Sequence, residues 1–313
     1  MSVLFTVVLP VFLILGYGYV VTWRGMLSDS AIDGIQRFAQ NFALPVLLFQ
    51  SMAAMDLGAD LDAGMLGAFY AGAFLGFALG YFGAQALGRP PEDCVAIGFV
   101  CLFSNSLLLG VPITERAYGA QALTGNYAII SIHSPLLYTF GITVMEFTRA
   151  RGQNLSVATV ALRALGGVLR TPLVIGILAG LAVNLAQTAG LVLPEGFWAA
   201  AGMIARAALP AALFGLGGIL YRYRPEGELR LVALCCAASL VIHPAVTLAL
   251  THAFGTPPAG VRSAVLTAAM PPGVNAYLFA ALYGRAQRVA ASSVLVATAL
   301  SLLTAWFWLG LLP

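Results

Sequence analysis

The sequence predicts an all-helical integral membrane protein of ten transmembrane helices, arranged as two inverted repeats of five helices each. Three observations lead to this fold class: an apolar composition, a series of long uncharged runs, and an uneven distribution of arginines. Hydrophobic residues make up 60% of the 313 residues and charged residues 9%, whereas soluble domains carry roughly a quarter charged residues. We therefore expect the chain to lie in a lipid bilayer.

Ten uncharged runs are long enough, or nearly so, to cross a hydrocarbon core that needs ~20 helical residues. The first lacks the basic start and the cleavage site of a signal peptide, so we interpret it as the first helix. The polar segment 149–165 is expected to be a cytoplasmic linker, with no separate soluble domain. The ten helices are expected at about residues 2–23, 31–55, 64–87, 94–115, 122–147, 168–189, 197–221, 230–253, 262–284 and 289–311.

The arginines predict the orientation, because loops rich in basic residues face the cytoplasm. Loops after even-numbered helices hold only Arg116 and Arg262. Both termini are therefore expected outside the cell, in a multi-pass protein of the inner (plasma) membrane. The arginines are too scattered for a nucleic-acid-binding surface. Loops after odd-numbered helices hold Arg24, Arg89, Arg149, Arg151, Arg163, Arg170, Arg222, Arg224, Arg230, Arg285 and Arg288.

An internal similarity predicts the repeat. Residues 43–49 (ALPVLLF) resemble residues 208–214 (ALPAALF), and a shift of about 165 residues also superposes the third, fourth and fifth helices on the eighth, ninth and tenth. The repeats are expected over 1–148 and 166–313. Because each contains an odd number of crossings, the second must begin on the opposite side of the bilayer, so the repeats are inverted.

The fourth and ninth helices are expected to be broken. Residues 103–112 (FSNSLLLGVP) place three polar side chains, a glycine and a proline in one apolar run, and residues 268–277 (AAMPPGVNAY) contain two consecutive prolines. Proline removes a backbone donor and glycine permits further unwinding. Irregular backbone inside a membrane persists only where protein or a water-filled cavity satisfies its polar groups. Both breaks therefore point to a functional site.

These two segments also resemble motifs of a known family. Residues 105–112 (NSLLLGVP) are similar to the Asn-Thr-Leu-x-x-Gly-Ile-Pro motif of the auxin efflux carrier family, and residues 269–274 with Phe279, Ala280 and Tyr283 resemble its second motif. This family includes plant auxin exporters and bacterial carriers for malate or malonate. The resemblance implies a crossover fold, like that of bile-acid symporters and antiporters, in which two broken helices cross at their prolines. It implies that Asn105 lines the substrate site.

Candidate site residues follow from the breaks and from intramembrane polar groups. Two of these groups also allow a purely structural role, since the serines can bond within a kinked helix and Arg206 can extend to the interface. The expected substrate-binding residues are Ser104, Asn105, Ser106, Arg206, Gly273, Asn275 and Tyr277. The expected helix-crossing residues are Gly110, Pro112, Pro271 and Pro272. His133 and His243 are candidates for proton coupling, because imidazole titrates near neutrality.

The resulting hypothesis is a secondary carrier of small organic anions, mono- or dicarboxylates such as malate or malonate, that works by alternating access. A passive facilitator or channel and a sodium-coupled symporter remain as alternatives. An enzyme is not expected, since the helices carry no aspartate pair or metal-binding motif. No cofactor or bound metal is expected, and the coupling ion, proton or sodium, is open. Gly72, Gly76 and Gly80 allow close helix packing, which also makes a homodimer conceivable.

Overall fold

The computed structural model describes residues 3–56, 62–149, 157–224, 226 and 228–313, and within these ranges every regular element is a helix. Six helical segments in this part of the chain are long and apolar enough to cross a membrane, and α8 with α9 would add a seventh if the bent pair is one span. A multi-pass membrane protein is thus confirmed. The count of ten stays a prediction, because other expected spans consist of shorter helices separated by breaks.

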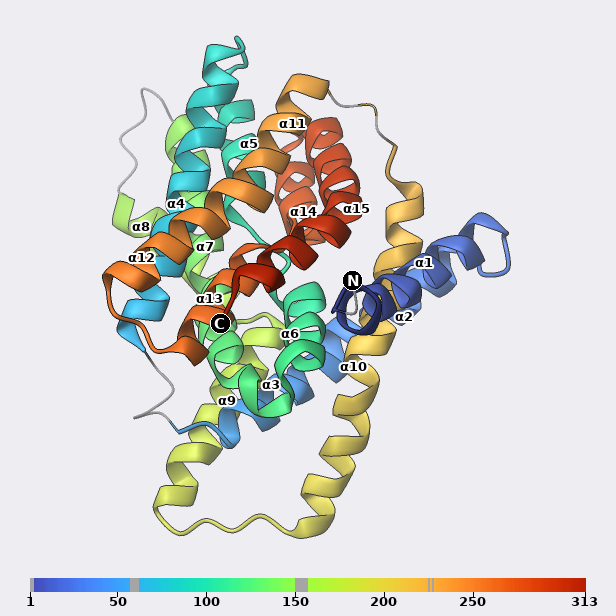
Figure 1. Cartoon of the computed structure of the whole chain (residues 1–313), viewed down its shortest axis with the longest axis vertical. Helices are drawn as coiled ribbons and strands as arrows, with labels where there is room; N and C mark the ends of the chain where they lie inside the picture. Colours follow the sequence, from blue (N-terminus) through green and yellow to red (C-terminus); the bar gives the residue numbers. More distant parts are fainter. Residues whose placement is uncertain (1–2, 57–61, 150–156, 225, 227) are drawn as a thin grey trace. The chain divides into compact units, whose positions relative to one another are not determined.

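The helices drawn in Figure 1 form two compact units. Unit 1 comprises Met1–Pro10, Asp62–Leu165 and Tyr223–Pro313, and unit 2 comprises Val11–Leu61 and Gly166–Arg222. Each unit therefore draws on both of the predicted repeats. The helix α8 (Val157–Val168), which occupies much of the segment expected as a linker, spans the boundary between the units.

Unit 2 contains helices whose backbones approach one another at glycines. Its helices are α1 (Leu9–Trp23, except its first two residues), α2 (Asp29–Phe38), α3 (Leu44–Ala53), α9 (Pro172–Thr188) and α10 (Glu195–Arg222). A Cβ atom at Gly18 of α1 would lie 2.0 Å from the carbonyl oxygen of Phe214 on α10. One at Gly176 of α9 would lie 2.4 Å from the carbonyl oxygen of Pro45 on α3. Only glycine allows these approaches.

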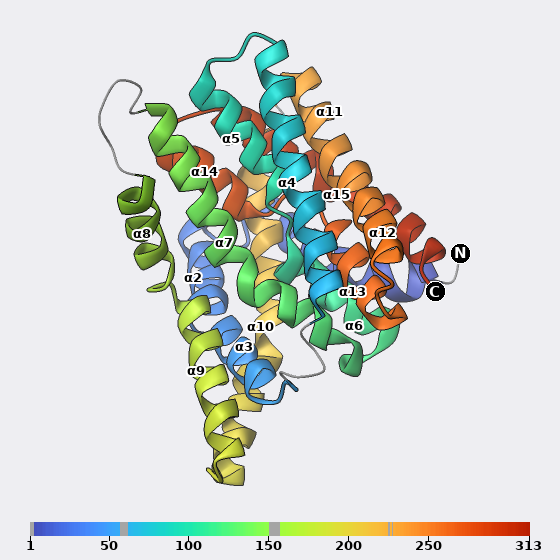
Figure 2. The ribbon, with the colours of Figure 1, turned by 90° about the vertical axis from the view of Figure 1, so that its left-hand side faces the viewer.

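Unit 1 contains the remaining helices, in two series from the two halves of the sequence. The first series is α4 (Ala63–Ala86), α5 (Pro91–Leu102), α6 (Val111–Tyr118) and α7 (Thr124–Arg149). The second is α11 (Leu229–Ala237), α12 (His243–Ala253), α13 (Pro258–Ala268), α14 (Val274–Tyr283) and α15 (Gln287–Leu311). Figure 2 shows α12 running alongside α4, so that the two series are interleaved within the unit.

The glycines of α4 serve packing inside unit 1. A Cβ at Gly72 would lie 2.8 Å from the ring of His243 on α12, and one at Gly76 would lie 2.8 Å from the carbonyl oxygen of Cys101 on α5. A Cβ at Gly80 would lie 2.7 Å from the sulfur of the same Cys101. These residues, spaced four apart, therefore let α4 approach two neighbouring helices. The glycine row is used within one chain and gives no support to a homodimer.

Candidate functional site

The first break separates α5 from the helical turn η3 (Ser106–Gly110), which continues directly into α6. α5 ends at Leu102, and Phe103 adopts an extended conformation with φ −99° and ψ 91°. Asn105 precedes η3, and its carbonyl accepts hydrogen bonds from the amides of Leu109 and Gly110, both at 3.2 Å. The chain thus leaves one half-helix and begins another within three residues.

The second break lies between α13 and α14. α13 ends at Ala268, and α14 begins at Val274 after Gly273, which is extended with φ −81° and ψ 167°. Neither Pro271 nor Pro272 can donate a backbone hydrogen bond, so the helix cannot pass through them unbroken. The position of this break was expected from the double proline, and the structure describes it there.

The two breaks pair with each other through an antiparallel bridge between Ser104 and Pro272. The amide of Asn105 donates to the carbonyl of Pro271 at 2.7 Å, and the amide of Gly273 donates to the carbonyl of Phe103 at 3.2 Å. Antiparallel pairs alternate between hydrogen-bonded and non-hydrogen-bonded positions. Ser104 and Pro272 occupy a non-hydrogen-bonded position, so the missing amide hydrogen of Pro272 leaves no bond of the bridge unmade. Each break satisfies backbone groups freed in the other.

The bridge brings together four of the expected substrate-binding residues. Ser104, Asn105 and Ser106 are all buried, and the two serine hydroxyl oxygens lie 2.7 Å apart. A Cβ at Gly273 would lie 3.5 Å from the Cα of Asn105. Asn105 and Gly273 each precede a half-helix, so the amino-terminal ends of η3 and α14 begin at the same place. Such ends carry a partial positive charge that favours anions.

The other expected residues of unit 1 lie around this bridge. Gly110 packs against the second break, since a Cβ there would lie 3.5 Å from the side chain of Met270, which follows α13. Pro112 lies inside α6, so the bridge forms at Ser104 and not at Pro112. Asn275 and Tyr277 follow on α14, and both are half-buried. The Tyr277 ring contacts that of Tyr223 at a centroid distance of 4.8 Å.

The two histidines both contact Phe69 of α4. Ring-centroid distances to Phe69 are 5.7 Å for His133 and 5.0 Å for His243. The His243 Nε2 atom is hydrogen-bonded to the carbonyl oxygen of Phe69 at 3.1 Å. His133 instead meets Phe103, the residue just before the bridge, edge to face at 4.6 Å. Only His133 therefore contacts the first break directly.

Comparison with known proteins identifies the family of the chain. A family model described as "Membrane transport protein" matches residues 3–309. The chain belongs to this membrane transport protein family. A Rhizobium meliloti (strain 1021) protein named "Putative malonate transporter" is 26% identical over 303 residues, which cover 95% of this chain and 92% of that protein. This relative, together with a plant auxin efflux carrier, confirms the resemblance to the auxin efflux carrier family that the two motifs predicted.

A second relative is a plant protein. The Oryza sativa subsp. japonica protein named "Probable auxin efflux carrier component 3b" is 29% identical over 154 residues, which cover 46% of this chain and 25% of that protein. The chain is therefore a transporter and not an enzyme. A transporter of this family acts on a small-molecule substrate and works in a membrane.

The structure of the transporter adds polar residues that the sequence did not single out. Asn126 of α7 is fully buried, and its amide nitrogen donates to the hydroxyl of Thr114 on α6 at 3.1 Å and to that of Thr267 on α13 at 2.8 Å. It thus joins the half-helix after the first break to the half-helix before the second. Tyr138 of α7 similarly donates to the carbonyl of Asn275 at 3.2 Å. An isolated polar residue in an apolar run is the sequence signal for both.

Arg206 belongs to unit 2 and lies on α10 with an exposed side chain. A Cβ at Gly202, one turn earlier, would lie 3.8 Å from both the Arg206 guanidinium and the Gln50 side-chain amide. Among the described residues, none of the ion pairs includes Arg206. The structure therefore leaves its charge available within its own unit, and it does not place it in the group of residues at the bridge.

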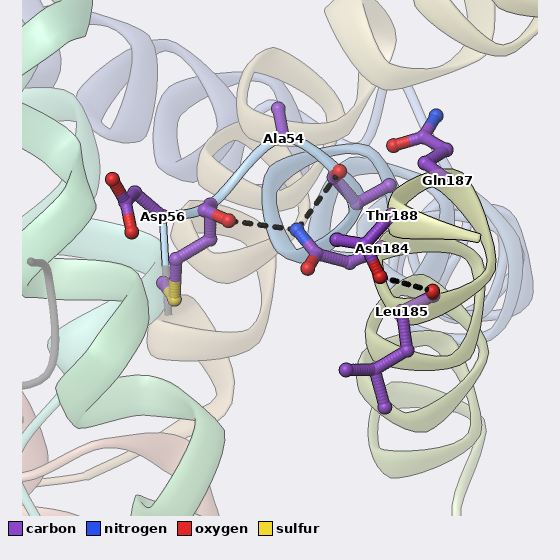
Figure 3. A pocket seen from close by; sticks show the side chains of 8 residues that line it. Ala54, Asp56, Asn184, Leu185, Gln187 and Thr188 are labelled. Carbon is purple, nitrogen blue, oxygen red and sulfur yellow. Dashed lines mark hydrogen bonds between the residues drawn. The ribbon is translucent and has the colours of Figure 1, made fainter. Parts of the chain in front are cut away.

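A pocket of about 680 Å³ lies in unit 2 of the transporter, between the end of α3 and α9 (Figure 3). Asn184 of α9 reaches across to the carbonyls of Met52, Ala53 and Met55 at 2.7 to 3.2 Å. Met52 and Ala53 end α3 and Met55 follows it, a region where helix carbonyls lack the amide partners they have inside a helix. Asn184 therefore caps α3, and the pocket contains none of the expected site residues.

Proposed function

We propose that this transporter is a secondary carrier of small organic anions, mono- or dicarboxylates such as malate or malonate, with its substrate site at the Ser104–Pro272 bridge. The observation that carries the proposal is the meeting of two half-helix amino termini beside the buried side chain of Asn105. Backbone amides and an asparagine amide are donors that a carboxylate accepts. The named substrate of the Rhizobium meliloti relative, malonate, supports the same class.

In this proposal, the substrate-binding residues are Ser104, Asn105, Ser106 and Gly273, with Asn275 and Tyr277 at the edge of the site. Pro271 and Pro272 maintain the break, and Gly110 and Pro112 shape the half-helix that follows the first one. Arg206 of unit 2 is proposed as a further anion-binding residue. A charged residue within a membrane-spanning helix usually serves a substrate path.

The division into units supports the proposed ten spans and inverted repeats. If spans are counted as the sequence predicts, unit 2 holds the first two spans of each repeat, except for the start of the first span up to Pro10, and unit 1 holds the last three. Two copies of one five-span motif would produce such an even division. The broken spans are the fourth of each copy, and their antiparallel pairing is what a crossover of inverted repeats requires.

The same division supports alternating access. The whole bridge belongs to unit 1, and unit 2 contains none of its residues. We therefore propose that unit 1 carries the substrate by moving relative to unit 2, which stays fixed in the membrane. Both termini lie outside the cell in this scheme, and the protein resides in the inner membrane.

Transport in proteoliposomes tests the proposal. Vesicles loaded with unlabelled malonate or malate should take up the labelled anion by counterflow, with saturation. Replacement of Asn105 by alanine should weaken binding by about 10- to 100-fold, since a hydrogen bond to a charged group contributes roughly 1.5–3 kcal/mol. Affinity is measured by titration of the purified protein.

Asn184→Ala is the matched control, because it removes an asparagine of unit 2 outside the proposed site. Its affinity for the anion should equal that of the unchanged protein. An unchanged affinity in Asn105→Ala would refute the site. Flux without saturation or counterflow would favour a channel or passive facilitator, and uptake that requires sodium would favour a sodium-coupled symporter.

A further inference from the structure

His133 is a buried polar side chain whose hydrogen-bonding capacity is unused. Its side chain lies on α7 with 3% of its surface exposed, and neither ring nitrogen makes a well-formed hydrogen bond to the described residues. A neutral imidazole carries one donor and one acceptor, and a protonated one carries two donors. Buried polar groups are normally bonded, so an exception points to a functional role.

The surroundings of His133 connect it to the proposed site. Its ring packs against Phe69 and Tyr70 of α4 and against Phe103 at the first break. The backbone of Ser104, the residue paired with Pro272, also interacts with the ring, although without the geometry of a hydrogen bond. A positive charge on His133 would therefore act on the bridge through low-dielectric surroundings, where charges interact strongly.

The other titratable groups near His133 are neutral or already engaged. Tyr70 of α4 donates its hydroxyl to the carbonyl of Ile129 at 2.7 Å, and Tyr138 of α7 donates to the carbonyl of Asn275. His243 of α12 is bonded to the carbonyl of Phe69. Among the described residues, none of the ion pairs includes a histidine. A proton on His133 thus has no protein counter-charge, and an anionic substrate would supply one.

We infer that His133 takes up one proton when the organic anion binds at the bridge, and that proton and anion are carried together. The neutral imidazole gains a proton at its unprotonated ring nitrogen as the anion enters, and loses it when the anion leaves on the other side of the membrane. His133 is assigned this part in preference to His243, because the ring of His133 contacts Phe103 at the first break, whereas that of His243 contacts Phe69. This inference rests on the proposed function and identifies its coupling ion.

Proton uptake on binding is the direct test. Malonate is titrated into the purified protein by calorimetry at one pH, in phosphate and in Tris, whose different ionisation enthalpies reveal how many protons are taken up. About one proton per bound malonate is expected, and the dissociation constant should rise up to about tenfold per pH unit, since one linked proton sets that limit. In His133→Gln, malonate should bind without proton uptake, and its affinity should change less than about twofold over the same pH unit.

Two further variants keep the test decisive. His133→Asn replaces the other ring nitrogen and serves if His133→Gln does not fold. His243→Gln is the matched control, a buried histidine that also contacts Phe69, and should retain proton uptake. Equal proton uptake in the His133 variants and the unchanged protein would place the proton on the substrate and overturn the inference, as would binding without uptake in the unchanged protein. If malonate and malate do not bind at all, the proposed function itself fails.

Discussion

The two units differ in what they bury. Within the described residues, unit 2 buries two polar side chains, Thr22 and Gln36, and Thr22 bonds within its own helix to the carbonyl of Gly18 at 2.9 Å. All other buried polar side chains of this part of the chain belong to unit 1, among them Asn105, Asn126 and His133. Buried polar groups in a membrane protein are costly, so their concentration in unit 1 supports the proposal that the substrate site lies there.

Single prolines and the double proline have different effects on the helices. Pro45 and Pro210, in the similar segments of the two predicted repeats, both remain within helical structure in unit 2. Pro271 and Pro272 end α13 in unit 1. A single proline loses one hydrogen bond, which a neighbouring turn can absorb by bending. Two consecutive prolines need a partner segment, and residues 103–105 provide it. The difference teaches that a helix break persists where a second break forms hydrogen bonds with the backbone groups that the first one frees.

The largest effect is expected from Gly18→Ala in unit 2. The new Cβ would lie 2.0 Å from a backbone oxygen of α10, so α1 and α10 would have to separate. Overpacking of this kind costs about 3 kcal/mol, and the midpoint of thermal unfolding in detergent should fall accordingly. Gly16→Ala on the same helix is the control, because no atom lies within 4 Å of its new Cβ. Equal midpoints for the two variants would show that unit 2 does not depend on glycine contacts.

A smaller loss is expected from Asn126→Leu in unit 1. It removes the hydrogen bonds to Thr114 and Thr267 and leaves both hydroxyls buried without that donor. The cost should be about 2 kcal/mol of stability, measured as a lower thermal midpoint. Thr304→Val is the control: the Thr304 hydroxyl has no hydrogen-bond partner among the described residues, so its removal should have little effect. If both variants unfold alike, buried polar contacts do not distinguish unit 1.

The smallest effect is expected from Arg222→Gln in unit 2. The Arg222 guanidinium pairs with Asp29 at 3.2 Å and with Asp33 at 2.8 Å, and both carboxylates are largely exposed. Exposed pairs contribute about 0 to 1 kcal/mol and weaken with salt. The thermal midpoint should therefore drop slightly at low salt and match that of the unchanged protein at high salt. A large, salt-independent drop would mean that unit 2 also depends on charge.

The sequence alone determined the features with local signals. Long apolar runs predicted a membrane protein, and the Asn105 to Pro112 and Ala269 to Val274 motifs predicted the family, which is confirmed. The double proline predicted one break at its observed place, because proline lacks a donor wherever it lies. Asn105 could be singled out for a similar reason, since an asparagine within an apolar run must find hydrogen-bond partners there.

Only the tertiary structure decided at which residues the distant segments meet. The bridge pairs Ser104 with Pro272, eight residues before the proline expected to mark the crossing, and Asn126 contacts a threonine 141 residues away. The units likewise combine helices from both halves of the chain. Such pairings depend on the shapes and freed backbone groups of both partners together, and neither partner carries a signal of the other in its own residues.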